Sequence, residues 1–474
     1  MPQNNDITRR QAVKIAGAAA VAAPFISKMR AANDQVQFGM IGTGSRGTYL
    51  LKHLAKIDNG RCVALCDLRQ EGLDLGVKTI GTNPKTFKDY RELLAQKDVD
   101  AVFVTTPLYM HFPITNDALN SGKHVFCEKS MVHKPDEVGR LRILAAQHPK
   151  QTLQVGLQRR YSRFYQTVKD MVDKGVLGDV KHIHCQWHRN MVNKPSSLWT
   201  MKPGGRSTWS NWRLYREFSG GIVAELTSHQ VDISDWMFGS QPEFVLGLGG
   251  LDTLKDGRDV YDNVQLIYNY SGGRKMTYSS VSTNSHLPLF NSTRSEMGEM
   301  IMGTDGTIHI TVGDDTNPAI AWWYREPTKA VVAAPGKNEP PKAAGATMVA
   351  GPASKPIPLL FDDLKLNNND SFLEKEVKFA RRWLYSKGVL VQEEQRNPVD
   401  QELEGFFTNC RDGKRPRADV EVGLADSTAV ILSNLAMDQQ RKIYFNEIDK
   451  IGGAAAPAMP KSTPMPTGTP KKNS

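Results

Sequence analysis

The chain has 474 residues, a formal net charge of +10, 40% hydrophobic and 23% charged residues. This length exceeds what one ordinary core requires, so we expect two or three domains plus tails. No apolar run approaches the roughly 20 residues that cross a bilayer, which argues against a membrane span. The positive charge gathers near the two ends and not in a basic stripe with interleaved aromatics, which argues against nucleic-acid binding.

Residues 1–32 combine a charged start with a mildly apolar stretch. Arg9 and Arg10 precede the apolar residues 15–26, and small residues follow. This order resembles a twin-arginine export signal, which implies that the protein reaches the periplasm already folded. An amphipathic helix with a basic end is the alternative. The five cysteines are an odd number, and they fit an exported protein if the thiols are buried and unpaired.

A glycine-rich turn follows the first predicted strand, residues 36–41. Residues 42–47 read GTGSRG, the GxGxxG spacing in which glycines allow a tight turn and close approach of a pyrophosphate. The next predicted strand, residues 61–66, ends at Asp67, whose carboxylate can bind a ribose. This pattern predicts NAD as the cofactor, while Arg69 would allow NADP. The predicted cofactor-binding residues here are Gly42, Gly44, Ser45, Arg46, Gly47 and Asp67.

Strands and helices continue to alternate up to residue 158. The predicted segments are strands at 101–105, 124–127 and 152–156, and helices at 111–120 and 135–147. Such alternation indicates a doubly wound parallel sheet, so we expect a Rossmann domain over residues 33–158. Ligands of these sheets bind at the carboxyl ends of strands. That rule draws attention to Thr106 and to the pair Glu128-Lys129, which follow two of the strands.

Three ionisable residues recur at helical spacing in the second half. Glu225, His229 and Asp232 fall at i, i+4 and i+7, so a helix would place them on one face. An imidazole has an ordinary pKa near 6.5, so it can take up and return the proton of a hydroxyl. We therefore expect this face to meet the cofactor cleft.

The glycine turn, Glu128-Lys129 and the segment at 220–232 occur together in one family, the Gfo/Idh/MocA oxidoreductases, which the chain resembles over roughly residues 35–310 and 400–446. The resemblance implies that Lys129 contacts the reacting hydroxyl while hydride passes to the nicotinamide. It also implies that His229 exchanges the hydroxyl proton, and that Glu225 orients the imidazole or binds a second hydroxyl. Ser130 stands where the family usually has proline.

The same resemblance extends the candidate site. It implies that Thr106, His111, Glu128, Lys129 and Gln158 also line the cofactor. The aromatic and basic side chains of Trp212 and Arg213, near Trp209, could stack on and grip a sugar. The predicted substrate contacts are Lys129, Arg159, Tyr161, Trp212, Arg213, Glu225, His229 and Asp232, and the predicted catalytic residues are Lys129, His229 and Glu225. For Gln158, Arg159 and Tyr161, a turn that links the two domains is an equally good interpretation.

Residues 159–451 are expected to form an α+β domain with an open, mostly antiparallel sheet. The predicted strands are 244–251, 263–270, 274–283 and 299–312. Family members often associate through this sheet, so we expect a homo-oligomer. Composition predicts a flexible insertion at 327–357 and a disordered tail at 452–474. His182, His184 and His188 share one face of a strand, but no nearby cysteine or acid completes a metal site, so we expect none.

Together these observations predict an exported NAD(P)-dependent oxidoreductase acting on a hydroxyl of a sugar, polyol or sugar derivative. The cofactor would be tightly bound, because free nicotinamide is a cytoplasmic resource. The alternative is an NAD-dependent, redox-neutral glycosidase that oxidises a glycoside transiently, although Leu226 stands where those enzymes have tyrosine. A sugar sensor that retains nucleotide is a third interpretation, which the pair Lys129 and His229 argues against.

Overall fold

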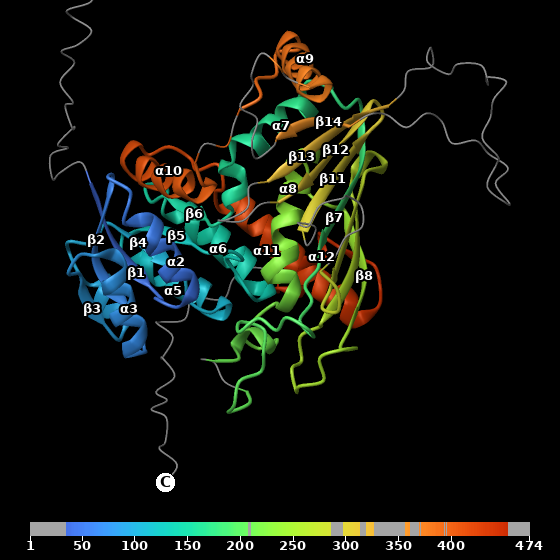
Figure 1. Cartoon of the computed structure of the whole chain (residues 1–474). Helices are drawn as coiled ribbons and strands as arrows, with labels where there is room; N and C mark the ends of the chain where they lie inside the picture. The colour runs from blue at the N-terminus through green and yellow to red at the C-terminus, as the bar shows by residue number, and fades with distance from the viewer. Residues whose placement is uncertain are drawn as a thin grey trace, which may run out of the picture.

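A computed structural model describes residues 35–206, 210–285, 297–312, 319–326, 356–360, 371–392 and 396–453, together with 369 and 394. The predicted export signal, the insertion up to residue 355, Trp209 and the tail from residue 454 lie outside these residues. Two sheet-based bodies meet along a seam, and the C-terminal helix α11 (Val420–Gln439) runs between them (Figure 1).

The N-terminal body is the expected Rossmann domain. Its six parallel strands have the order β3-β2-β1-β4-β5-β6, so the direction of winding changes between β1 and β4. The strands are β1 (Val36–Ile41), β2 (Gly60–Cys66), β3 (Lys85–Phe87), β4 (Ala101–Val104), β5 (His124–Cys127) and β6 (Leu153–Val155). The helices are α2 (Ser45–Leu54), α3 (Gln70–Ile80), α4 (Tyr90–Leu94), α5 (His111–Asn120) and α6 (Pro135–Gln147), with the 3-10 turns η2 (Leu108–Met110) and η3 (Gln158–Tyr161).

The second body is built on a nine-stranded sheet of order β14-β13-β12-β11-β7-β10-β9-β8-β15. Among the described strands of this second sheet, only β7 and β10 pair in parallel, so the sheet is mostly antiparallel, as predicted. The strands are β7 (Val180–Trp187), β8 (Phe244–Gly250), β9 (Asn263–Asn269), β10 (Lys275–Val281), β11 (Met297–Gly303), β12 (Gly306–Thr311), β13 (Ile320–Arg325), β14 (Ile357–Leu360) and β15 (Ile443–Tyr444). The remaining helices are α7 (Arg163–Asp173), α8 (Ser228–Phe238), α9 (Phe372–Ser386), α10 (Pro398–Asp412) and α12 (Glu447–Ile451), with 3-10 turns η4 (Trp212–Leu214) and η6 (Ser271–Gly273) and the π-helix η5 (Val223–Thr227).

One predicted strand, 299–312, is wrong as a single element. The structure has an antiparallel hairpin, in which β11 and β12 pair from Gly298 opposite Thr311 to Met302 opposite Thr307. The four-residue stretch from Gly303 to Gly306 makes the turn. Such turns favour glycine, which tolerates unusual backbone angles, and aspartate, whose side chain hydrogen-bonds locally. Apolar residues alternate on both sides of this turn, so the sequence pattern did not reveal the reversal of the chain.

Helix α10 belongs to the Rossmann core, although it lies within the range 159–451. Its Phe406 and Phe407 are fully buried. The Phe407 ring lies 5.4 Å from that of Phe38 on β1, and both helix rings contact Phe103 on β4. A parallel sheet must be covered on both faces, and α10 supplies part of that cover from the far end of the chain.

Helix α11 is the one described helix that is long and apolar enough to cross a membrane, and 61% of the relevant window is buried within the protein. It contacts α6 and β6 of the Rossmann domain and α8 and β8 of the second body. These contacts make α11 a core helix shared by the two bodies, which accounts for its composition.

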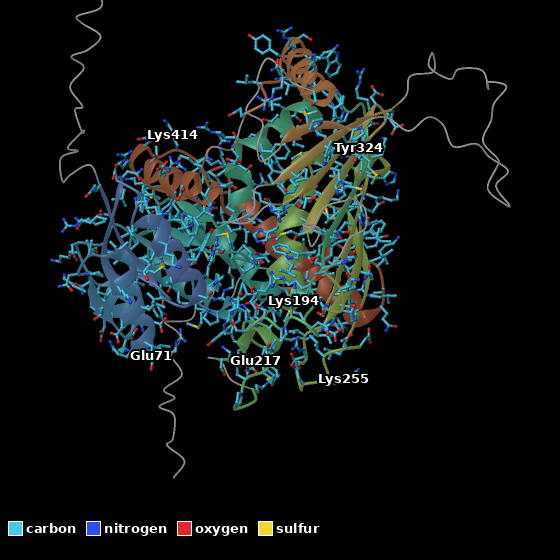
Figure 2. All side chains as sticks on the ribbon, viewed as in Figure 1. Glu71, Lys194, Glu217, Lys255, Tyr324 and Lys414 are labelled. Atoms are coloured by element: carbon cyan, nitrogen blue, oxygen red, sulfur yellow. The ribbon has the colours of Figure 1, made fainter. Side chains whose placement is uncertain are left out.

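Charge is distributed differently at the surface and at the seam. Figure 2 shows Glu71, Lys255 and Lys414 projecting from the periphery, where all three are exposed. In contrast, Asp232 and Asp426 are nearly inaccessible between the two bodies. The five cysteines are free and four are buried, which agrees with the expectation of buried, unpaired thiols.

Candidate active site

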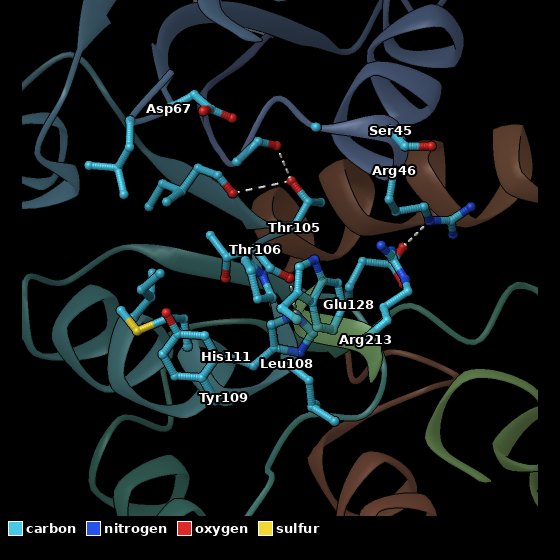
Figure 3. Close-up of a pocket in the computed structure, with 18 of the residues that line it drawn as sticks. Ser45, Arg46, Asp67, Thr105, Thr106, Leu108, Tyr109, His111, Glu128 and Arg213 are labelled. Carbon is cyan, nitrogen blue, oxygen red and sulfur yellow. Dashed lines mark hydrogen bonds and ion pairs between the residues drawn. The ribbon is translucent and has the colours of Figure 1, made fainter. Parts of the chain in front are cut away.

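A cavity of about 530 Å³ opens at the carboxyl ends of the Rossmann strands. This volume is in the usual range for ligand sites, and its position beside β1 and β4 is where doubly wound sheets bind ligands. Residues from both bodies line it (Figure 3). The predicted site residues among them are Gly42, Gly44, Ser45, Arg46, Asp67, Thr106, His111, Glu128, Lys129, Gln158, Trp212, Arg213, Glu225 and His229.

The glycine turn is shaped to admit a pyrophosphate. Gly42 has φ +94°, and a Cβ there would lie 2.8 Å from the carbonyl oxygen of Thr105. A Cβ on Gly47 would lie 2.0 Å from the oxygen of Gly42, so Gly47 stands behind the cavity wall and lets α2 pack closely. A Cβ on Gly44 would meet nothing nearer than 3.7 Å, so this position faces open space. The turn leads into the N-terminus of α2, where backbone N–H groups favour an anion.

Asp67 lies at the end of β2 as predicted. One carboxylate oxygen accepts from the backbone N–H of Thr43 at 2.9 Å, and the other accepts from the N–H of Arg69 at 2.9 Å. The Arg69 guanidinium is 3.5 Å away and half exposed. These bonds fix the acid at the cavity wall, where its remaining lone pairs can accept from ribose hydroxyls.

Arg46 and Glu128 tie the glycine turn to the end of β5. The Arg46 Nε and a Glu128 carboxylate oxygen are 2.6 Å apart (Figure 3). Burial opposes the charge on Arg46, but the Glu128 carboxylate outweighs it and raises the pKa of the guanidinium. The guanidinium therefore stays charged, and the ion pair holds two cofactor-lining segments, 82 residues apart in sequence, in contact.

Lys129 is anchored by the second body. Its Nζ donates to the backbone oxygens of Ala224 and Glu225, both at 2.8 Å. Burial lowers the pKa of this amine, and the carboxylates of Glu225 and Glu128 oppose that shift. An ammonium has three N–H donors, so the third remains for a ligand in the cavity.

The carbonyls that hold Lys129 belong to a π-helix, Val223–Thr227, where regular helical spacing predicted one polar face. The wider i→i+5 turn shifts the residues that follow it relative to an α-helix, and such turns are frequent at functional sites. Glu225 and His229 line the cavity, whereas Asp232, three residues after His229 in the regular helix α8, does not. Asp232 pairs with the Arg160 Nε at 2.7 Å.

His229 is neutral in this environment. Burial, followed by the positive charges of Lys129 and Arg159, lowers its pKa well below the usual value. The imidazole lies against the indole ring of Trp187, with centroids 5.9 Å apart. Trp187 therefore provides packing for the ring, while an unprotonated nitrogen remains able to accept a proton.

Glu225 binds Arg213, and the predicted contact with the imidazole is not among its hydrogen bonds. Its carboxylate lies 3.2 Å from the Arg213 Nε. Burial would raise the pKa of Glu225, but Arg213 and Lys129 lower it below its ordinary value. The Arg213 guanidinium lies 4.2 Å from the ring centroid of Trp212. Glu225, Arg213 and Trp212 thus form one wall of the cavity.

His111 connects the two strand-end loops. Its Nδ1 lies 2.7 Å from the oxygen of Ser130, and its Nε2 lies 3.0 Å from that of Thr106. The Thr106 hydroxyl and the Gln158 amide oxygen are buried without a hydrogen-bond partner in the described part of the chain. Both residues line the cavity, and buried polar atoms of this kind are available to a bound ligand.

Arg159 and Tyr161 lie outside the cavity lining, so this placement does not support their predicted contact with substrate. Arg159 forms a buried ion pair at 2.5 Å with Glu299, which also accepts from the Tyr165 hydroxyl at 2.8 Å. Tyr161 lies against Gly405 of α10. These residues join the Rossmann domain to the sheet body and to α10.

The structure adds lining residues that sequence patterns did not indicate. They are Tyr109, Leu198, Lys202 and Ser210, among others. Tyr109 follows Pro107 after β4, and the rule that ligands bind at strand ends could have identified it. The other three come from the irregular segment before α8, which carries no periodic signal.

The described residues contain no group of three or more potential metal ligands. His184 Nδ1 lies 2.8 Å from the Thr277 hydroxyl, and His188 Nε2 lies 3.0 Å from the Ser279 hydroxyl. These histidines bond to the neighbouring strand β10, so they are polar residues of the sheet face.

Models of known protein families match both bodies of the chain. Residues 36–157 match a model described as "Oxidoreductase family, NAD-binding Rossmann fold", and residues 165–309 match "GFO/IDH/MocA C-terminal domain". An inositol 2-dehydrogenase of Rubrobacter xylanophilus is 27% identical over 285 residues, 60% of this chain and 73% of that protein. Other curated relatives align over about half of their own length, 45% and 47% in two cases.

Solved structures show the same fold. The aldose-aldose oxidoreductase of Caulobacter crescentus has a TM-score of 0.61 at 16% identity, with 86% of this chain and 99% of that chain covered. A levoglucosan dehydrogenase in complex with NADH and levoglucosan has a TM-score of 0.62 at 14% identity, with 87% and 99% covered. The two family models match the two bodies of the chain, and the glycine turn and the cavity agree with that match. The chain is therefore an NAD-binding oxidoreductase of the Gfo/Idh/MocA family.

Proposed function

We propose that the protein oxidises a carbon-bound hydroxyl of a sugar or polyol by hydride transfer to NAD. The observation that carries this proposal is the meeting of Lys129 and His229, supplied by different bodies, in one cavity beside the glycine turn. The related proteins include inositol, aldose and levoglucosan enzymes, whose names all denote polyhydroxylated compounds. The cavity wall offers both ionic and aromatic surface to such a molecule.

Separate groups of residues would bind the cofactor and act on the substrate. The turn from Gly42 to Ser45 and the N-terminus of α2 would hold the pyrophosphate, and Asp67 would hold the ribose. Bound NAD supplies the hydride acceptor. Lys129, fixed by two carbonyls, would point its third N–H at the substrate oxygen and stabilise negative charge as it develops there.

His229 would accept the hydroxyl proton. A base must be unprotonated before the reaction, and burial keeps this imidazole neutral at pH 7. The same low pKa makes the protonated form short-lived, so the proton would pass on to solvent or to the second substrate. Activity should therefore fall on the acid side only when pH approaches the lowered pKa of His229.

The wall formed by Trp212, Arg213 and Glu225 would select the substrate. An indole face packs well on the apolar face of a sugar ring. The Glu225 carboxylate stays ionised and pairs with Arg213, so this wall presents donors and acceptors to ring hydroxyls. This combination favours a neutral, hydroxyl-rich ring over an apolar alcohol.

Export and assembly are further parts of the proposal. The resemblance of residues 1–32 to a twin-arginine signal supports export with the cofactor already tightly bound. Replacing Arg9 and Arg10 by lysine should then retain the protein in the cytoplasm, measured by cell fractionation. The outer sheet face exposes Leu246, Leu248 and Ile267, which supports a homo-oligomer through the sheet, measurable by analytical ultracentrifugation.

One experiment separates the candidate functions. Purified protein would be incubated with a panel of sugars, polyols and glycosides, while the absorbance of bound cofactor and the release of aglycone are followed. Reduction without cleavage supports the oxidoreductase. Cleavage without net reduction would show the redox-neutral glycosidase, and silence across the panel would overturn both in favour of a sensor.

A further inference from the structure

Helix α11 holds the segment that follows Lys129. The Ser130 hydroxyl donates to an Asp426 carboxylate oxygen at 3.1 Å, and the Met131 N–H donates to the Ser427 hydroxyl at 3.0 Å. All of these polar partners are buried. A Cβ on Gly423 would lie 2.2 Å from the Met131 sulfur, so α11 approaches the loop as closely as a glycine permits.

The same helix also supports the other side of the site. The Asn434 side-chain amide donates to the oxygen of Gly220, just before the π-helix, at 3.1 Å. Helix α11 packs against both η5 and α8. The loop that carries Lys129 and the carbonyls of Ala224 and Glu225 that bind its amine are therefore both braced by one element.

We propose that Asp426 and Ser427 are positioning residues for Lys129, and that the bond from Ser130 to Asp426 replaces the rigidity of the proline usual at position 130 in the family. This inference rests on the proposed role of Lys129 in contacting substrate. The hydroxyl of Ser130 needs an acceptor in this buried place, and Asp426 provides it. The Ser427 hydroxyl also accepts from the Val132 N–H at 3.4 Å, so two side chains of one helix turn fix three consecutive loop residues.

The charges around Asp426 give this role a pH signature. Asp232 of α8, with Asp235 nearby, repels it, while Lys129 and Arg160 attract it. Burial first and Asp232 second raise the pKa of Asp426 to about 7. Above that pH its carboxylate favours the charged form of Lys129, which Glu225 and Glu128 also favour. Below it, this contribution disappears.

Five variants test the proposal: D426N, D426A, S427A, S130P and the double variant D426A/S130P. A matched control is S433A, which changes a buried serine of the same helix that bonds to Tyr268. The apparent pKa of Lys129 would be measured by its pH-dependent acetylation with acetic anhydride and mass spectrometry. The pH profile of kcat would be measured alongside it.

D426N should lower the apparent pKa of Lys129, by about half a unit because one attracting charge is removed. D426N and S427A should also lower kcat, by roughly tenfold, because a displaced reacting group loses alignment. S130P should have lower activity, because it leaves the buried Asp426 carboxylate without the Ser130 donor. D426A/S130P should be more active than D426A, because proline removes the serine hydroxyl that has lost its acceptor. Proline keeps the position-130 carbonyl that His111 contacts.

The labelling readout requires no turnover, so it stays informative if the sugar panel fails and the proposed function falls. The proposal would be overturned if Lys129 kept its wild-type pKa in D426N and S427A turned over as fast as S433A. A double variant no better than D426A would overturn the link to Ser130. If D426N does not fold, S427A and S433A still decide whether α11 positions the loop.

Discussion

Replacing Lys129 by methionine removes its N–H donors while keeping an unbranched side chain of similar length. The lost donor to a developing oxyanion should lower kcat by about 10²–10³, equivalent to roughly 2.7–4 kcal/mol. The loss of folding stability should be smaller than this loss of transition-state stabilisation. Both carbonyl oxygens lose the Lys129 donor, but the oxygen of Ala224 still accepts from the Ser228 hydroxyl at 2.8 Å, so the loss of stability should be no more than about 1–3 kcal/mol.

The assay is rapid-mixing measurement of cofactor reduction, with bound NAD quantified separately after denaturation. K129M should retain NAD, because the glycine turn and Asp67 are unchanged. The matched control is K78M, which alters an exposed lysine of α3 in the same domain. If K129M reduces its cofactor as fast as K78M does, Lys129 does not stabilise the reacting oxygen and the mechanism is refuted.

Three other changes address separate parts of the molecule. H229A should lower kcat by about 10²–10⁴ through loss of the proton acceptor; turnover at the wild-type rate on the true substrate would remove His229 from the mechanism. G47A should yield protein without bound NAD, because its Cβ would lie 2.0 Å from the Gly42 oxygen, and a full complement of cofactor in the purified variant would contradict this. F407A should lower the free energy of unfolding by about 3–5 kcal/mol in urea denaturation; an unchanged midpoint would show that α10 does not complete the Rossmann core.

The Rossmann domain was predictable because its signals are local. Parallel strands covered on both faces are short apolar runs, and the glycine turn and Asp67 fall at fixed offsets from two of them. The strand-end rule likewise placed Thr106 and Glu128 at the cavity. In each case the sequence neighbours of a residue determine where it points.

The seam was not predictable by the same means. The spacing of Glu225, His229 and Asp232 indicated one shared face, but Asp232, three residues after His229 in the regular helix α8, pairs with Arg160 and does not line the cavity. Asp426 meets Ser130 across 296 residues. No periodicity or motif encodes such a contact, because it depends on how two finished bodies pack.

The buried ion pairs along the seam favour a role in geometry over one in stability. Arg159 with Glu299 and Arg160 with Asp232 join segments that lie 140 and 72 residues apart. Desolvation offsets most of the attraction within such a pair, whereas removing one partner is strongly destabilising. A seam of this kind adds little net stability, but it penalises every arrangement in which the partners fail to meet. The two bodies are thus held in the one relative position that brings Lys129 and His229 to the same cavity.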